Sequence, residues 1–294
     1  MTVLHICAGW EETNGAAVIA RLLAGEQQAA GHDVRFARWA SPSALREADE
    51  VWTHCGWLPV LWWAGLWARK LVRVPEACYD PVRLAYHGWK KRLVRPIERF
   101  FVRKAARVIA TCAAEADWIR AYEPKAKVEV TDVKRFFKGL GLEAARAPLP
   151  RPHGTLSLLY LGRRHPLKGV GNLERAVREL GAEGRRVELK VVSDAVGAEK
   201  EKAWAACDAL VLPTLSDNFG LVVAEALERG KRVITTDGAP AWEPEGSKKE
   251  KGKVKKCGRL TYLCGYRDGT DEERVRLLKG ALERLGGAYG YGRR

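Results

Sequence analysis

The sequence lacks the cysteine patterns of metal-binding and disulfide-rich proteins. Its seven cysteines include no pair with C-x-x-C spacing, and an odd number does not suit a disulfide framework. Several lie inside apolar, strand-like runs, which favours reduced thiols in a cytoplasmic protein. Cys, His and Asp residues form no sequence cluster typical of a metal centre, so we expect no metal site.

Long hydrophobic segments are also absent. The most apolar run, residues 56–68, has 13 residues, whereas a membrane-spanning helix needs about 20. Its tryptophans lie next to cations and suit a membrane interface, but a buried helix is the alternative. The first ten residues contain no lysine or arginine, so we expect a strand there and not a signal peptide.

Acidic residues are scarce in two segments that carry most of the net charge of +15. Residues 82–107 contain nine lysines or arginines and one acid, and residues 246–259 contain seven and one. Localised charge favours a polyanionic partner such as lipid, saccharide or nucleic acid phosphates. We expect the first segment to form a helix that contacts an anionic membrane peripherally, or is simply a solvated face. The second is predicted to be a surface loop.

Apolar, β-rich runs alternate with helix-period segments along the chain, which predicts an α/β fold. Expected helices cover residues 59–73, 86–106, 113–122, 169–181, 199–206, 220–229 and 271–285, the last of them ending at Gly286-Gly287. A proline-rich linker at 143–154 divides the pattern. We therefore predict two doubly wound, Rossmann-like domains facing across a cleft, residues 1–150 and 151–294. The final helix is a candidate to cross back to the first domain.

The stretch "SDNFGLVVAE", residues 216–225, follows the apolar run "ALVLPT". It places Asp217 at the carboxyl end of a predicted strand and Glu225 among apolar residues of the next helix. A carboxylate in apolar surroundings needs a hydrogen-bond partner, and a ligand hydroxyl would serve. The alternative is an ordinary helix cap and an exposed helix residue.

The stretch "YLGRRHPLKGVGNL" opens the second predicted domain. A strand ends at Gly162, the loop offers Arg163 and Lys168, and a helix begins near Gly169. Two cations beside a helix N-terminus form an anion site suited to a diphosphate. The alternative is a pair of solvated basic residues.

These two blocks, together with "GKRVITTDGAPAWE", resemble the retaining family 4 glycosyltransferases of the GT-B fold, of the bacterial surface polysaccharide or lipopolysaccharide type. A weaker resemblance runs through "NGAAVIARLLAGEQQAAGHDV", "VWTHCGWLPVL" and "CYDP". It covers most of the chain. The C-terminal blocks are specific in combination and not singly.

The resemblance implies a role for each matching residue. Arg163 and Lys168 would bind the donor diphosphate, Asp217 the transferred sugar and Glu225 the ribose, and these four are the candidate catalytic residues. The implied donor contacts also include Gly15, Asn218, Phe219, Gly220 and Leu221. His54 and Glu76 would lie on the acceptor side or near the sugar.

The implied activity is metal-independent transfer of a hexose-like sugar from a UDP- or GDP-type donor, without a cofactor, to a saccharide or lipid-linked acceptor in cell-envelope glycan synthesis. Asp217 stands where the family usually has Glu, and the segment between "VELKVV" and "ALVLPT" is short. Alternatives are another GT-B enzyme, such as a nucleotide-sugar epimerase or a phosphorylase, and a basic phosphate- or nucleic-acid-binding module. Nucleic acid is not expected, because no recognition motif accompanies the charge.

Overall fold

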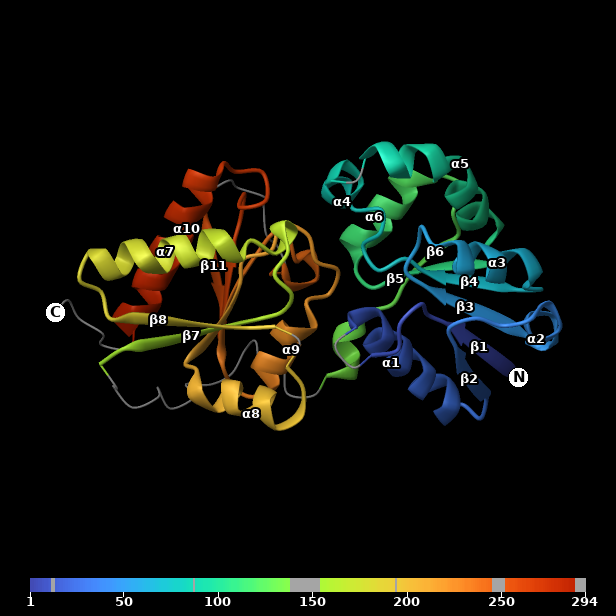
Figure 1. Cartoon of the computed structure of the whole chain (residues 1–294), viewed down its shortest axis with the longest axis horizontal. Helices are drawn as coiled ribbons and strands as arrows, with labels where there is room; N and C mark the ends of the chain where they lie inside the picture. Colours follow the sequence, from blue (N-terminus) through green and yellow to red (C-terminus); the bar gives the residue numbers. More distant parts are fainter. Residues whose placement is uncertain (12–13, 87, 138–153, 194, 245–251, 289–294) are drawn as a thin grey trace. The chain divides into compact units, whose positions relative to one another are not determined.

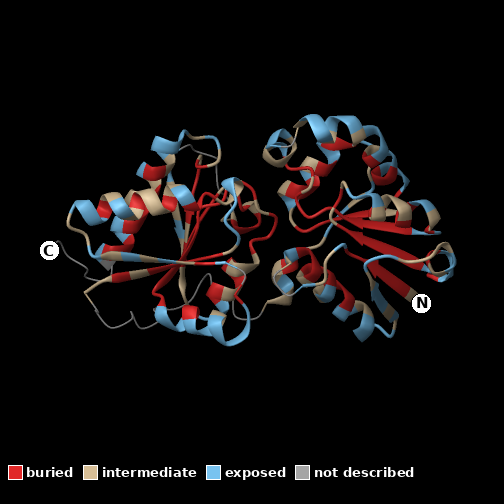
Figure 2. Cartoon of the chain, in the orientation of Figure 1, coloured by how far each residue is buried: buried red, intermediate tan, exposed pale blue. Residues whose placement is uncertain are grey.

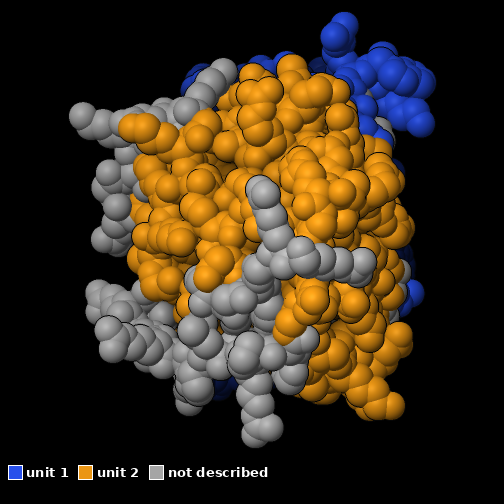
Figure 3. Space-filling model, turned by 90° about the vertical axis from the view of Figure 1, so that its left-hand side faces the viewer, with its two compact units in different colours: residues 1–136 blue, residues 137–294 orange. Residues whose placement is uncertain are grey.

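The computed structural model describes all residues except 12–13, 87, 138–153, 194, 245–251 and 289–294. The chain forms two compact units, residues 1–136 and 137–294 (Figures 1 and 3). The predicted domain boundary after residue 150 lies outside the described residues, as does the predicted linker up to residue 153. In the described part, every helix is too short or too polar to cross a bilayer.

The first unit alternates strands and helices from its first residues. Its elements are β1 (Thr2–Ile6), α1 (Gly15–Ala29), β2 (Asp33–Ala37), α2 (Pro42–Glu47), β3 (Glu50–His54), α3 (Pro59–Trp67), β4 (Leu71–Val74), α4 (Pro81–Tyr86), α5 (Gly88–Lys104), β5 (Arg107–Ala110), α6 (Ala113–Tyr122), β6 (Val128–Val130) and the 3₁₀ turn Val133–Phe136.

All six strands of this unit are parallel, in the order β2-β1-β3-β4-β5-β6. Every residue of β3 and β4 is buried, whereas β2 and β6 lie at the edges and are more exposed (Figure 2). The strand order reverses between β1 and β3, and ligands of doubly wound sheets bind beyond the carboxyl ends of the strands at such a point.

The second unit repeats the alternation. Its elements are β7 (Leu156–Leu161), the 3₁₀ turn Pro166–Lys168, α7 (Val170–Ala182), β8 (Val187–Val192), α8 (Gly197–Ala206), β9 (Ala209–Leu212), α9 (Leu221–Glu228), β10 (Arg232–Thr236), the 3₁₀ turn Pro240–Trp242, β11 (Val254–Cys257), β12 (Leu260–Leu263) and α10 (Asp271–Ala288).

This sheet has the order β11-β12-β10-β9-β7-β8, and β11 alone of its six strands is antiparallel. The strand order reverses between β7 and β9, so a second ligand-binding edge is expected at their carboxyl ends. Helix α10 packs against α7 of the same unit (Figure 1). The two sheets, one parallel and one mostly parallel, with helices between most consecutive strands, confirm the predicted pair of Rossmann-like domains.

Three predicted elements were wrong in part. The helix predicted over 59–73 ends at Trp67, because Ala68 adopts an extended conformation and the apolar run that follows forms β4 beside β3. The loop predicted over 246–259 contains β11, which pairs with the otherwise open edge of β12; residues 246–251 lie outside the described part. The last helix continues through Gly286, which is buried against Leu156 of β7.

Candidate functional site

The loops that follow β7 and β9 are tied together by hydrogen bonds. The Leu167 carbonyl accepts from the Leu215 N–H at 2.8 Å and from the Thr214 hydroxyl at 3.1 Å. Gly169 has φ +66°, and a Cβ there would lie 2.0 Å from the Pro213 carbonyl oxygen. Only glycine permits this approach, and it holds the loop that carries the neighbouring lysine at the carboxyl ends of both strands.

Lys168 and Asp217 form an ion pair between these two loops. Their side chains are 18% and 19% exposed, so the pair is neither buried nor freely solvated. The Asp217 N–H donates to the Gly238 carbonyl at 2.7 Å, and the Asp217 carboxylate accepts from the Asn218 N–H at 2.8 Å. Two residues 49 positions apart in the sequence, both predicted for the donor site, are thus brought together.

Two arginines of the β7 loop differ in their contacts. Arg164 pairs with Glu174 of α7 at 2.5 Å. The Arg163 side chain is exposed, and it makes no ion pair with the residues that the structure describes. Its carbonyl accepts from the Tyr160 hydroxyl at 2.9 Å, and burial raises the pKa of Tyr160, which keeps that hydroxyl a donor. Arg163 is therefore the loop cation left available to an anion.

Gly220 is the N-cap residue of α9. It has φ +66° and provides no side-chain hydrogen bond to the helix. The Phe219 ring is buried, 5.5 Å from the Phe137 ring and 5.1 Å from the Trp242 ring. Trp242 also donates to the Phe219 carbonyl. Phe219 consequently positions the loop, and only its backbone could serve a ligand. Leu221, the first residue of α9, is half-buried.

Glu225 lies in the second turn of α9 and pairs with Lys200 of α8 at 2.8 Å. Both side chains are about three-quarters buried, with 23% and 26% exposed. The apolar setting of Glu225 was predicted, but its cationic partner was not. Lys200 belongs to no motif. Its sequence offers one signal, which is that it lies in the helix after β8, the strand that pairs with β7.

A chain of buried polar side chains crosses the carboxyl ends of β1, β3 and β4 in the first unit. His54, the last residue of β3, has Nδ1 3.2 Å from Glu76 Oε1 and Nε2 2.9 Å from His5 Nδ1. His5 Nε2 lies 2.8 Å from Gln27 Oε1. Both ring nitrogens of His54 are thus engaged within the protein. His5 and Gln27 carry no motif and were missed by sequence reasoning.

Burial decides the protonation states of these hydrogen-bonded side chains. It lowers the pKa of His54 to about 3, and burial and the neighbouring His54 lower that of His5 to about 3. Burial and then the nearby Glu115 raise the pKa of Glu76 well above its ordinary value. With Gln27 accepting from His5, each histidine donates through Nε2, so a protonated Glu76 must donate to His54 Nδ1.

Backbone strain gathers around the same residues. Among the described residues, the non-glycine positions with positive φ are Cys55 (70°), Trp57 (66°), Glu76 (54°) and Ala77 (60°). They lie in the loops that follow β3 and β4. Left-handed conformations cost free energy for such residues and concentrate at functional sites. Gly15 is the first residue of α1, the helix that follows β1. It comes directly after the N-cap residue Asn14, and it is exposed.

The structure does not test whether these residues bind a ligand, so the roles assigned to them stay predictions. Within the described ranges, no group of three or more His, Cys, Asp and Glu side chains could hold a metal ion. Metal-independent chemistry likewise stays a prediction.

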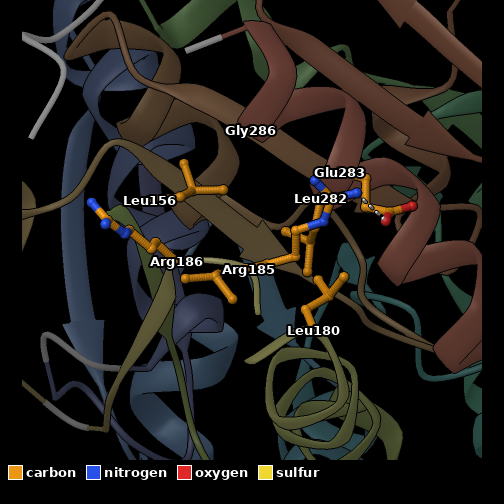
Figure 4. Close-up of a pocket in the computed structure, with 8 residues that line it drawn as sticks. Leu156, Leu180, Arg185, Arg186, Leu282, Glu283 and Gly286 are labelled. Atoms are coloured by element: carbon orange, nitrogen blue, oxygen red, sulfur yellow. Dashed lines mark hydrogen bonds and ion pairs between the residues drawn. The ribbon is translucent and has the colours of Figure 1, made fainter. Parts of the chain in front are cut away.

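A small apolar pocket lies at the amino ends of strands β7 and β8 in the second sheet (Figure 4). Leu156 and Val187 begin β7 and β8, and the pocket is closed by Leu180 of α7 and Leu282 of α10. Arg185 pairs with Glu283 at its rim, at 3.2 Å. It lies at the amino ends of the strands and is therefore distinct from the loops that carry Lys168 and Asp217.

Two separate doubly wound units of this kind define the class of GT-B proteins, and the solved structures agree. The chain superposes on sucrose-phosphate synthase from Thermosynechococcus elongatus with a TM-score of 0.64 and 16% identity, covering 99% of this chain and 90% of that one. WaaG, a glycosyltransferase involved in lipopolysaccharide biosynthesis, gives a TM-score of 0.60 and 13% identity, covering 98% and 93%. At such identities the likeness establishes the fold.

Sequence comparison finds similarity to glycosyltransferases. Residues 35–134 match the model of the glycosyl transferase 4-like domain. The chain is 30% identical over 224 residues to the D-inositol 3-phosphate glycosyltransferase of Streptomyces scabiei, covering 62% of this chain and 49% of the relative. The chain spans about half the length of the curated relatives it matches. The predicted resemblance to GT-B glycosyltransferases of family 4 is confirmed; a lipopolysaccharide type is not part of what the comparisons establish.

Proposed function

We propose that this protein is a retaining glycosyltransferase that moves a hexose-like sugar from a nucleotide-sugar donor to a saccharide or lipid-linked acceptor. The observation that carries the proposal is the Lys168–Asp217 pair at the carboxyl ends of β7 and β9. A cation for a diphosphate and a carboxylate for sugar hydroxyls stand side by side where doubly wound sheets bind ligands. The family 4 resemblance supports the same assignment.

In this proposal the donor is a UDP- or GDP-type sugar, and its diphosphate lies between Arg163 and Lys168. The negative charge of the leaving nucleotide grows in the transition state, so cations fixed at that point contribute to rate as well as binding. The N-terminus of α9 adds backbone N–H groups and a favourable dipole. These groups would replace a metal ion, and the reaction needs no cofactor.

The carboxylates divide the rest of the donor between them. Asp217 accepts from hydroxyls of the transferred sugar, and Glu225 accepts from the ribose. When the donor binds, Lys168 and Lys200 exchange part of their pairing with these carboxylates for the incoming phosphate and hydroxyl groups. The acceptor attacks from the face that the nucleotide leaves, and the departing phosphate takes the acceptor proton, so the anomeric configuration is retained.

We place this reaction in the cytoplasm, at the inner face of the cell membrane, in the synthesis of a cell-envelope glycan. The D-inositol 3-phosphate glycosyltransferase of Streptomyces scabiei and WaaG support a role in sugar transfer. The acceptor of each is a property of that protein. Glu76 and His54 are proposed for the acceptor side. Glu76 lies in the strained loop that follows β4, and the buried His54, the last residue of β3, bonds to it.

A thermal-shift panel tests the donor site. Purified protein is melted with UDP, GDP, ADP, their common sugar conjugates and a short DNA duplex. A ligand at about 100 times its Kd adds roughly 2.7 kcal/mol, which raises the melting midpoint by several degrees. We expect a rise with one nucleotide that is lost in Lys168→Ala. A rise with DNA alone would support the basic binding module instead. Analysis of the sugar products in the same mixtures checks the epimerase alternative, which would convert the donor sugar without any acceptor.

A further inference from the structure

Helix α5 presents an apolar stripe to solvent, opposite to what a helix on a sheet usually does. Its large exposed side chains are Trp89 (69%), Leu93 (72%), Ile97 (45%) and Phe100 (56%). Tyr86, at the end of α4, is exposed as well. Scattered exposed hydrophobic residues are ordinary, but a contiguous row marks an interaction surface.

Helical geometry gathers the four α5 residues into one stripe. At 3.6 residues per turn, Trp89, Leu93, Ile97 and Phe100 fall within an arc of about 80°. The side chains that α5 buries are Glu98, Phe101 and Val102, and they lie on another arc, roughly 120–220° from Trp89. The helix therefore has two apolar faces. One is covered by the first unit, and the exposed stripe is a second face that packing within the unit does not explain.

Cations border the stripe. Helix α5 contains seven lysines and arginines and one glutamate. That glutamate, Glu98, is fully buried and paired with Arg73 at 2.6 Å, so it does not offset the surface charge. Lys90, Arg92 and Arg95 are exposed, and the Lys90 ammonium lies 5.6 Å from the Trp89 ring.

The C-terminal half of α5 extends the same surface. Arg99 and Arg103 share Glu123 at 2.9 and 3.0 Å, and each side chain remains partly exposed. Lys104 donates to the carbonyls of Gly65 and Leu66 at the end of α3. These bonds hold the backbone of Leu66, whose side chain is exposed, next to the C-terminal end of α5.

We infer that this surface, which we call the α5 face (Tyr86, Trp89, Leu93, Ile97, Phe100 and Leu66 with their flanking cations), lies in the headgroup region of an anionic membrane, and that the acceptor is lipid-anchored. Aromatic and aliphatic side chains on one arc, bordered by lysine and arginine, are the signature of a helix that lies in the interface plane. Aromatic rings beside ammonium groups suit the headgroup level. The charges select anionic lipid.

This inference rests on the proposed function and narrows it. A transferase held at the bilayer by one face of its acceptor-side unit meets a membrane-bound acceptor by diffusion in two dimensions, whereas a soluble saccharide would gain nothing from the attachment. The α5 face does not include any residue proposed for the donor site. Donor binding and membrane binding can therefore be measured separately.

The test is co-sedimentation of the full chain with vesicles of phosphatidylglycerol and phosphatidylcholine, and with phosphatidylcholine alone. We expect binding to the anionic vesicles only, weakened several-fold between about 0.1 and 0.5 M NaCl because salt screens the lysine and arginine contribution. Trp89 fluorescence is one of eleven tryptophan signals, so sedimentation is the better readout.

The double variant Trp89→Ser, Leu93→Ser is expected to lower the vesicle partition coefficient at least tenfold, because both side chains would leave the acyl boundary. Trp39→Ser is the matched control: Trp39 is also exposed in the first unit but lies outside the α5 face, and binding should persist. The double variant should still show the nucleotide-dependent thermal shift of the wild-type chain, which establishes that it is folded and keeps its donor site.

Three results would overturn the inference: no binding to anionic vesicles, equal binding by the double variant, or a wild-type dimer in solution that the double variant abolishes. The last would assign the α5 face to a second copy of the chain. A nucleotide-dependent thermal shift without vesicle binding would remove the membrane and leave the transferase. Vesicle binding without any nucleotide effect would do the reverse.

Discussion

His54 Nδ1 lies 3.2 Å from Glu76 Oε1, and neither residue is exposed to bulk water. The other nitrogen of His54 is taken by His5, which is bonded in turn to Gln27. Such a chain has a direction, because each neutral imidazole donates once and accepts once. The direction set by Gln27 requires a proton on Glu76, and the raised pKa of Glu76 agrees with it.

Glu76→Gln should therefore be tolerated, whereas Glu76→Ala should not. The glutamine amide can donate to His54 as the protonated acid does, and it has no ionised form that burial disfavours. Alanine leaves His54 without its partner, at a cost of about 1–3 kcal/mol. Urea unfolding at pH 7 measures both variants. If Glu76→Gln loses as much stability as Glu76→Ala, the carboxylate is ionised and the direction of the chain is reversed.

The pH dependence gives an independent check of the same residue. Because the folded-state pKa of Glu76 is raised, its contribution to stability is present below its unfolded value and is lost as the pH rises through the folded value. The wild type should lose stability from about pH 5 upward relative to Glu76→Gln. Parallel stability curves for the two proteins would contradict a protonated Glu76.

His5 and His54 predict the opposite slope in acid. Both pKa values are lowered from 6.5 to about 3. Between pH 6.5 and about pH 3, these two histidines therefore bind more protons in the unfolded protein than in the folded one. Stability should fall as the pH drops from about 6.5 towards 3, by an amount on the order of a few kcal/mol. Urea midpoints measured at half-unit pH steps report the slope.

The variant that isolates this slope is His5→Phe. The His5 ring lies 5.4 Å from the Trp52 ring and 5.6 Å from the Phe36 ring, so an aromatic replacement keeps the stacking. It should flatten the acid slope even if it lowers stability at pH 7. His32→Asn, a histidine outside this chain of side chains, should leave the slope as it is. An unchanged slope in His5→Phe would show that other groups govern acid unfolding.

The buried pair Arg73–Glu98 should be a main determinant of first-unit stability. The two side chains lie 2.6 Å apart and are both fully buried, and Glu98 also accepts from Trp57, Trp62 and Tyr79. Removing one partner of a buried pair strands the other charge, so Glu98→Ala should cost about 3–5 kcal/mol. Asp33→Ala breaks the exposed Arg35–Asp33 pair and should cost less than about 1 kcal/mol. Urea unfolding compares the two, and similar losses would contradict the assignment.

Sequence reasoning succeeded where the determining residues are close together along the chain. The strand–loop–helix pattern around Lys168 and Gly169 predicted β7, α7 and the position of the loop between them, because a strand end and a helix start fix that loop. The same logic located Asp217 before α9. Both residues then met at one sheet edge, since parallel strands share their carboxyl ends.

It failed where tertiary contacts decide. Lys200 meets Glu225 only because the fold brings α8 close to α9, where Glu201 and Arg229 also pair, and no periodicity of α8 reveals that. His5 and His54 are 49 residues apart and are brought together by the β1–β3 pairing. The stretch that became β11 has the charge of a loop, and its strand conformation depends on the open edge of β12.

The Lys200–Glu225 pair predicts how far Glu225 depends on its neighbour. Its side chains are partly exposed, so a double-mutant cycle with Lys200→Met and Glu225→Gln should give a coupling energy of about 1 kcal/mol or less. Glu225→Gln should also weaken nucleotide binding, because a neutral amide oxygen accepts a weaker hydrogen bond from the ribose hydroxyls than a carboxylate does. If Lys200→Met weakens nucleotide binding as strongly as Glu225→Gln, the lysine itself contacts the donor and the assignment shifts to α8.

Lys168 provides the sharpest test of the proposed chemistry. Lys168→Ala removes the cation that would face the leaving diphosphate, and the loss of one such group lowers turnover by about 100- to 1000-fold. The loop should keep its shape, because Gly169 and the Leu167 carbonyl hold it through the backbone. Arg164→Ala is the matched control: it removes a cation of the same loop that is committed to Glu174, and it should retain nearly full turnover. Sugar transfer to acceptor at saturating donor measures both. Nearly full activity in both variants would place the diphosphate away from Lys168. A similar large loss in both variants would mean that the overall charge of the loop, and not the position of Lys168, binds the donor.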